Sequence, residues 1–87
     1  MYVILVYDVR EERVSKVLKY LRRYLNWVQN SVFEGEITPA RLERMKMGLR
    51  KILKEDEDSV YIYKLRDERW MEKEVIGQKR AITERII

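Results

Sequence analysis

The sequence contains no cysteine and no histidine, and it has only one proline and no long apolar run. Without cysteine and histidine, a single chain cannot build the usual zinc sites, a thiol nucleophile or a Ser-His-Asp triad. Any catalysis must therefore use carboxylates, Lys, Arg, Tyr, hydroxyl groups or a hard metal ion. The longest apolar run, residues 2–7, is far shorter than the roughly 20 residues that cross a bilayer. No basic leader precedes this run, so we expect a cytoplasmic protein.

Charge is abundant. Of the 87 residues, 39% are charged and 46% are hydrophobic, and the formal net charge is +4. This hydrophobic content is enough for one small domain, but a core of this size is modest, so a dimer would bury more surface. The positive balance favours a polyanionic partner such as nucleic acid.

The spacing of apolar residues predicts alternating strands and helices. The continuous run over residues 2–7 predicts a central strand, and the residues from 11 to 25 predict an amphipathic helix. Residues 27–37 predict a strand followed by a second strand or a turn, with Gly35 marking a bulge or turn. A second helix is expected to start with Thr38 as N-cap and Pro39 in the first helical position.

The rest of the chain predicts a turn and two further strands. The acidic residues 55–58 form the turn, "SVYIYKL" at 59–65 is a central-looking strand, and "WMEKEVIG" at 70–77 is a shorter one. This order predicts a single α+β domain over residues 1–87, with the ferredoxin-like βαββαβ fold, an additional C-terminal strand and both helices on one face of the sheet. The apolar end of the chain predicts that residues 78–87 pack on the partner protomer of a homodimer.

Asp8 ends the first predicted strand, and two interpretations of it stay open. An acidic side chain three residues later, at Glu11, fits a helix-capping pattern. Alternatively, Asp8 is a metal ligand, because Mg²⁺ takes oxygen ligands and often uses only one or two carboxylates together with waters and substrate phosphates. A two-fold dimer would supply a second Asp8.

Both predicted helices are basic. Residues 11–25 hold five Lys or Arg against two Glu, and residues 40–54 hold six against one. Such charge is either a solvated outer face or a surface for backbone phosphates. As nucleic-acid-binding residues we predict Arg10, Arg13, Lys16, Lys79 and Arg80.

Aromatic and hydroxyl residues suggest a second kind of surface. Tyr61 and Tyr63 share one face of their predicted strand, and we expect Tyr7 to join them from the neighbouring strand. Such aromatics either stack on bases of single-stranded RNA or pack in a core or interface. Ser31 has no histidine partner, so it is expected to be structural or substrate-binding.

Four segments carry a family resemblance. They are "YDV" at the end of the first strand, "VQNSVFEGEIT" from residue 28, "DSVYIYKL" from residue 58 and "GQKR" from residue 77. Together they resemble the CRISPR-associated protein two family, the small companion of the CRISPR integrase in spacer acquisition. The resemblance covers nearly the whole chain.

The resemblance implies a ferredoxin-like homodimer whose C-terminal segment adds to the partner's sheet. It implies a scaffold that binds duplex DNA and bridges integrase subunits and, in some members, a Mg²⁺-dependent endonuclease acting on RNA or DNA. Asp8 matches the aspartate that holds Mg²⁺ from each subunit. Arg13 matches a basic residue at the start of the first helix, and Phe33 matches the aromatic residue of the "SVF" segment. Among the candidate site residues, we expect Tyr7, Ser31 and Phe33 to have supporting roles.

One departure from the family bears on catalysis. In "YLNWVQ", Trp27 stands where many relatives have a phosphate-binding arginine. The residues therefore leave two rival functions open: a noncatalytic module for single-stranded RNA that uses the tyrosine face, and a toxin-like ribonuclease of the virulence-associated D family.

Overall fold

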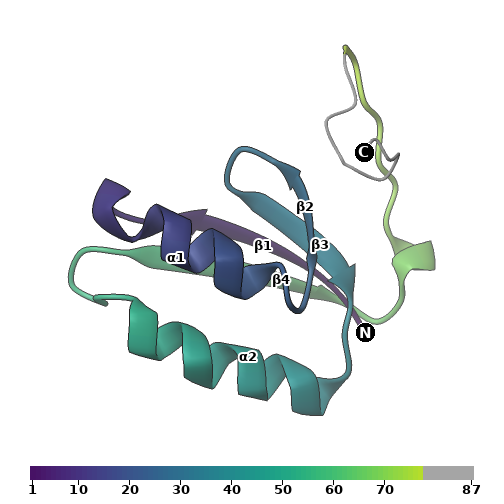
Figure 1. Ribbon diagram of the computed structural model, residues 1–87. Coiled ribbons are helices and arrows are strands. Elements are labelled where there is room, and N and C mark those ends of the chain that lie inside the picture. The colour runs from purple at the N-terminus through teal and green to yellow at the C-terminus, as the bar shows by residue number, and fades with distance from the viewer. Residues whose placement is uncertain (78–87) are drawn as a thin grey trace.

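The computed structural model describes residues 1–77, which form an α+β ferredoxin-like fold. Four strands make one antiparallel sheet in the order β2-β3-β1-β4, so β1 and β3 are central, as predicted. Both helices cover the same face of this sheet (Figure 1). The elements are β1 (Tyr2–Asp8), α1 (Glu11–Leu21), β2 (Asn26–Gln29), β3 (Val32–Glu36), α2 (Pro39–Ile52), β4 (Ser59–Leu65) and a 3₁₀ turn (Glu68–Trp70).

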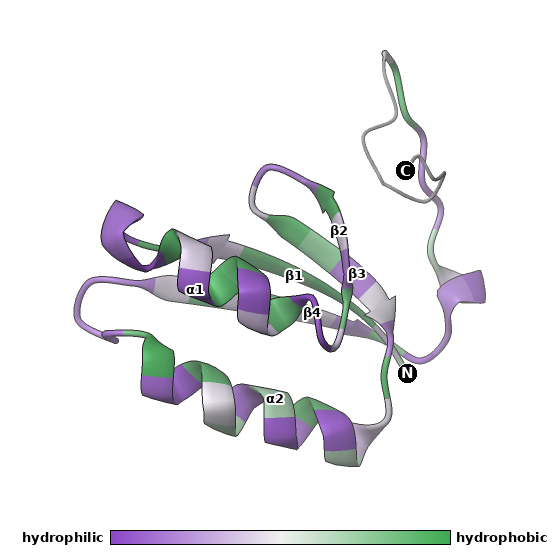
Figure 2. Cartoon of the chain, viewed as in Figure 1, coloured by the Kyte–Doolittle hydropathy of each residue, from purple (hydrophilic) through white to green (hydrophobic). Residues whose placement is uncertain are grey.

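The core lies between the sheet and the helices. Leu5 of β1 stands opposite Phe33 of β3 and Ile62 of β4, so all three side chains point toward the helices. Apolar residues run along β1, and they alternate with polar residues along both helices (Figure 2). The largest fully buried side chains are Phe33, Leu5, Leu21, Leu42, Met45, Val3 and Val17. In the described part of the chain, neither helix combines the length and apolarity needed to span a membrane.

Among residues 1–77, neither α1 nor α2 covers the opposite side of the sheet, which we call the open face. It presents alternate residues of the two neighbouring strands, because Val6 pairs with Tyr61 and Ile4 pairs with Tyr63. Its members from β1 and β4 are Tyr2, Ile4, Val6, Asp8, Ser59, Tyr61, Tyr63 and Leu65. Tyr61 and Tyr63 are 60% and 57% exposed. Large aromatic side chains at this level of exposure are suited to contact another molecule.

The prediction that Tyr7 joins this aromatic face is wrong. Tyr7 pairs with Val60, one position out of step with Tyr61, so its side chain points to the helix side of the sheet. There it is buried, with its ring centroid 6.2 Å from that of Phe33.

Residues 27–37 were predicted as a strand followed by a second strand or a turn, and the structure shows a second strand: β2 and β3 form a hairpin. The turn lies at Asn30, whose φ of 34° is a left-handed conformation that asparagine tolerates better than most residues. Gly35 lies inside β3, so the turn predicted there is wrong, and the irregular pairing falls in β2 between Trp27 and Gln29.

The helix predictions hold, apart from one boundary. The Thr38 side chain accepts a hydrogen bond from the Arg41 amide at 3.2 Å, and Pro39 opens α2, as expected. The first helix ends at Leu21, four residues before the predicted Leu25.

The strand predicted over residues 70–77 is wrong within the described chain. The Asp67 side chain accepts a hydrogen bond from the Arg69 amide at 2.9 Å, which starts the 3₁₀ turn, and residues 71–77 contain no strand. Lys73 then forms an ion pair with Glu34 of β3. The predicted partner-packing tail at 78–87, including Lys79 and Arg80, lies outside the described residues.

Candidate functional site

Asp8 is the last residue of β1, and its side chain is exposed at the end of a central strand. Ser59 of β4 stands opposite it. No hydrogen bond or ion pair engages the Asp8 carboxylate within residues 1–77. Asp8 does not cap the following helix, because α1 begins at Glu11 and Arg10 is in the N-cap position. The capping interpretation is therefore wrong, because Asp8 lies two residues before that position.

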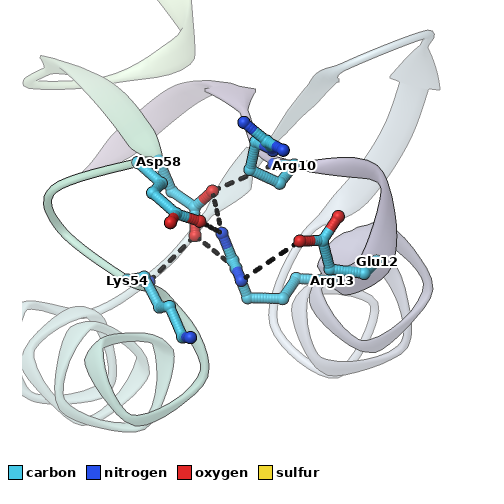
Figure 3. A network of polar contacts seen from close by, with 6 residues as sticks. Arg10, Glu12, Arg13, Lys54 and Asp58 are labelled. Carbon is cyan, nitrogen blue, oxygen red and sulfur yellow. Dashed lines mark hydrogen bonds and ion pairs between the residues drawn. The ribbon is translucent and has the colours of Figure 1, made fainter.

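The Asp58 carboxylate, rather than Asp8, accepts hydrogen bonds from groups at the start of α1. One carboxylate oxygen, Oδ1, accepts a hydrogen bond from the Arg10 amide at 2.9 Å, and the other, Oδ2, accepts one from the Lys54 amide at 2.9 Å. The Arg13 side chain donates to both oxygens, from Nε to Oδ2 at 2.6 Å and from Nη2 to Oδ1 at 2.9 Å (Figure 3). The Asp58 side chain is completely buried. Asp58 therefore joins the loop after β1, the start of α1 and the end of α2.

These contacts shift the pKa values of both partners. Hydrogen bonding from Arg13 holds the pKa of the Asp58 carboxyl well below its usual range, and the amides of Lys54 and Arg10 lower it further. The same hydrogen bond, with a second that Arg13 donates to the Glu57 carboxylate at 2.7 Å, raises the pKa of the Arg13 guanidinium. The Arg13 side chain is only 11% exposed. Arg13, which we predicted to bind nucleic acid, is therefore bound to carboxylates of its own chain.

One chain offers only part of a metal site. Within residues 1–77, no three His, Cys, Asp or Glu side chains gather closely enough to hold a metal ion. The exposed Asp8 carboxylate is nevertheless the hard oxygen donor that Mg²⁺ takes, and Mg²⁺ sites often include only one or two carboxylates. Asp8 can therefore serve as one carboxylate ligand of a Mg²⁺ ion, and a second protomer would have to contribute the second carboxylate.

Four lysines line a groove between the two helices. Lys16 and Lys19 come from α1, Lys51 comes from α2, and Lys54 follows it. We call this feature the lysine groove. Among residues 1–77, the lysines in ion pairs are Lys46 and Lys73, so no ion pair neutralises these four. The groove is therefore a concentrated positive surface suited to phosphates.

The structure separates the other predicted site residues. Arg10 is exposed two residues after Asp8 in the sequence. Tyr7 and Phe33 are buried on the helix side of the sheet, away from the open face. The Ser31 carbonyl accepts a hydrogen bond from the Tyr7 amide at 3.0 Å, which gives Ser31 a structural contact. The Trp27 indole donates to the Asn30 carbonyl at 3.1 Å and so supports the same turn.

Sequence reasoning missed Asp58 and three of the four groove lysines. Asp58 was included in an acidic turn, and its partner Arg13 is 45 residues away in the chain, so no local pattern joins them. The basic character of both helices was evident, but only their antiparallel packing decides which lysines converge.

Comparison with known proteins agrees with the fold. The family described as CRISPR associated protein Cas2 matches residues 1–73. A CRISPR-associated endoribonuclease Cas2 from Pyrococcus furiosus is 56% identical over 87 residues, which covers the whole of both chains. One from Archaeoglobus fulgidus, called Cas2 2, is 56% identical over 82 residues, which are 94% of this chain and 89% of that one.

Solved structures give the same result. A crystal structure titled as Cas2 superposes with a TM-score of 0.83 at 50% identity, and the match covers 92% of this chain and 90% of that one. Cas2 from Streptococcus pyogenes superposes with a TM-score of 0.72 at 36% identity, over 86% of this chain and 100% of that one. The chain therefore belongs to the Cas2 family of CRISPR-associated proteins, as its sequence motifs indicated.

Proposed function

We propose that this chain is a homodimeric subunit of CRISPR adaptation that binds duplex DNA through its phosphates and bridges integrase subunits. We further propose that Asp8 from each protomer gives the dimer a Mg²⁺-dependent endonuclease activity. The observation that carries the proposal is the exposed Asp8 carboxylate, which no residue among 1–77 engages, at the end of a central strand in a member of the Cas2 family. The curated relatives named as endoribonucleases support RNA as the substrate.

The open face supports the homodimer. It exposes Tyr61 and Tyr63 on the side of the sheet that neither α1 nor α2 covers (Figure 1). Exposed aromatic patches of this kind mark interaction sites. A second copy related by a two-fold axis would cover the tyrosines and bring the two Asp8 residues toward each other, because Asp8 belongs to the same face. In the described chain β4 is an edge strand, and the partner's residues 78–87 would protect it.

The chain supplies specific groups for hydrolysis of a phosphodiester. A bound Mg²⁺ would polarise a phosphoryl oxygen and lower the pKa of a water molecule. The two Asp8 carboxylates would hold the ion between the protomers. The exposed Arg10 side chain, close to Asp8 in sequence, would balance the negative charge that develops on the phosphate. Arg13 does not serve this purpose, because its guanidinium is bound to Asp58 and Glu57.

The lysine groove supports DNA binding. Four lysines that form no ion pair within residues 1–77 can each neutralise a phosphate without first breaking a salt bridge. Contacts of this kind do not depend on base sequence, and each contributes about 0.9 to the slope of log affinity against log salt. A scaffold that accepts many different DNA segments needs this type of recognition.

The adaptation role is tested by affinity purification of the tagged full-length chain from cells that carry their own CRISPR system. We expect the integrase subunit to copurify, and light scattering of the purified chain to give the mass of a dimer. A monomer that brings down no integrase would overturn the proposal. Removal of residues 81–87 should shift the mass toward the monomer, which tests the contribution of the tail separately.

The exposure of Tyr61 and Tyr63 also favours a second candidate, a module that stacks the bases of single-stranded RNA on these rings. The two candidates use the same side chains in different ways. The homodimer buries the tyrosines against a second copy, whereas the RNA module needs them free.

A further inference from the structure

A set of contacts that we call the clasp holds the loop that follows Asp8. The clasp consists of the Asp58 carboxylate, the Arg13 guanidinium, and the backbone amides of Arg10 and Lys54. Its four hydrogen bonds to Asp58 measure 2.6 to 2.9 Å (Figure 3). A buried carboxylate with this many donors has a single favourable orientation, because any rotation leaves donors unsatisfied.

The clasp holds the chain on both sides of Asp8. Ser59 is the cross-strand neighbour of Asp8, and it directly follows Asp58 in sequence. Arg10, two residues after Asp8, donates its amide proton to Asp58. The loop from β1 to α1 is therefore pinned at its start by strand pairing and after Asp8 by Asp58. From this fixed part of the chain, the Asp8 side chain points toward the open face.

We infer that Asp58 is a positioning residue for Asp8: it fixes the loop so that the Asp8 carboxylate is directed at the metal ion shared by the two protomers. This inference rests on the proposed function of Asp8. A ligand that is held in place before the ion arrives binds it more tightly than one on a mobile loop, because less freedom is lost on binding. Asp58 touches neither the metal ion nor the substrate.

Asp58→Asn removes part of the hydrogen bonding at this position while it keeps the shape of the side chain. The asparagine has nearly the same size, but only its oxygen can accept hydrogen bonds. Two of the four donors that face Asp58 would then meet an amide NH₂ group, so the loop would lose part of its support. A matched control is Thr38→Ala, which removes the cap at the opposite end of α2 from Lys54.

The test compares the wild type with both variants as full-length proteins, using single-stranded RNA as substrate and MgCl₂ as the source of the ion. For Asp58→Asn we expect the Mg²⁺ concentration for half-maximal cleavage to rise at least tenfold. We also expect hydrogen exchange at the Arg10 amide, followed by NMR, to become at least tenfold faster. Thr38→Ala should lower the melting temperature but leave both quantities near the wild-type values.

The outcomes are distinguishable. If the wild type cleaves, Asp8→Asn does not, and Asp58→Asn keeps the wild-type Mg²⁺ dependence, only the positioning inference fails. A wild type that does not cleave under any Mg²⁺ concentration removes the proposed nuclease function and this inference with it. If Asp58→Asn does not fold, Arg13→Lys replaces it, since lysine keeps the charge and loses the paired geometry. It should raise the half-maximal Mg²⁺ concentration by a smaller factor, and an unchanged value would overturn the inference.

Discussion

The hydroxyl of Tyr20 occupies the space in which Gly48 would carry a side chain. Tyr20 lies on α1 and donates a hydrogen bond to the Met45 carbonyl of α2 at 3.1 Å. A Cβ atom at Gly48 would come within 2.0 Å of the Tyr20 oxygen. The close approach of the two helices, which form the walls of the lysine groove, therefore depends on this glycine.

Gly48→Ala should destabilise the protein. Overpacking typically costs about 1–3 kcal/mol, whereas alanine in place of glycine gains at most about 1 kcal/mol of helix propensity. We expect a net fall in the free energy of unfolding, measured by urea denaturation. Met47→Ala is the control, because Met47 is exposed on the same helix and its loss should change little. An unchanged or higher denaturation midpoint for Gly48→Ala would show that the tyrosine ring can move aside without loss.

Asp58 should make stability depend on pH in a defined window. Its pKa is lowered in the folded protein, so the stabilisation is complete above the unfolded-state value of about 3.9 and is lost as the pH falls below it. We expect the difference in melting temperature between the wild type and Asp58→Asn to be largest near neutral pH. That difference should narrow below about pH 4.

This comparison cancels the contributions of carboxylates that do not bind Arg13. The pKa values of Glu43 and Asp67 are also lowered, but both groups and their partners are the same in each protein. A difference in melting temperature that stays constant from pH 7 to pH 3 would contradict the assignment of the pH dependence to Asp58.

Much of the fold was predictable from the sequence, because local patterns determine it. The apolar run of β1 and the Thr38-Pro39 helix start depend on neighbouring residues only, and both predictions are confirmed. The place of the hairpin turn was missed, because glycine is the usual signal for a turn and here the turn lies at Asn30 rather than at Gly35. The strand over residues 70–77 was predicted from composition, which does not show whether a neighbouring strand is present in the same chain.

The site was less predictable, because it depends on register and on distant partners. The position of Tyr7 follows from its pairing with Val60, and a shift of one residue would reverse its face. Asp8 was identified as a candidate because it ends a strand, and the structure excludes the alternative that it caps α1. The engagement of Arg13 by Asp58 could be found only in three dimensions.

Lysine groove substitutions should weaken DNA binding in a salt-dependent way. Replacement of Lys16 and Lys51 by alanine should reduce the slope of log affinity against log salt by about two, one for each lost phosphate contact. The matched control replaces Arg44 and Lys64, two exposed basic residues outside the groove, with the same change in charge. Equal slopes for the two double variants would place the groove outside the DNA footprint. The same titration with Lys79→Ala and Arg80→Ala tests the two predicted contacts outside the described residues.

Substitution of Tyr61 and Tyr63 by serine should distinguish the two uses of the open face. If the face is a dimer interface, sedimentation should show a dissociation constant of the dimer raised by at least tenfold, because two large aromatic side chains are lost from the buried interface. A variant that stays fully dimeric but no longer binds single-stranded RNA would favour the stacking module. Lys64→Ala, on the same strand but on the other face, is the control.

Asp8→Asn should also change the response of stability to Mg²⁺. Two aspartates close together repel each other without a cation, and a neutral asparagine removes that repulsion. We expect the variant to be at least as stable as the wild type in EDTA and to gain no melting temperature when Mg²⁺ is added. The wild type should gain stability with Mg²⁺, because an ion that binds only the folded dimer stabilises it.

The most direct test of the proposed function is cleavage of single-stranded RNA by the wild type and by Asp8→Asn, measured in parallel with Mg²⁺ and with EDTA. Light scattering and circular dichroism should first show that both proteins are folded dimers. We expect cleavage by the wild type with Mg²⁺, none with EDTA, and none by Asp8→Asn under either condition, while the variant still binds duplex DNA. Cleavage by Asp8→Asn at the wild-type rate would show that paired Asp8 carboxylates do not hold a catalytic metal ion.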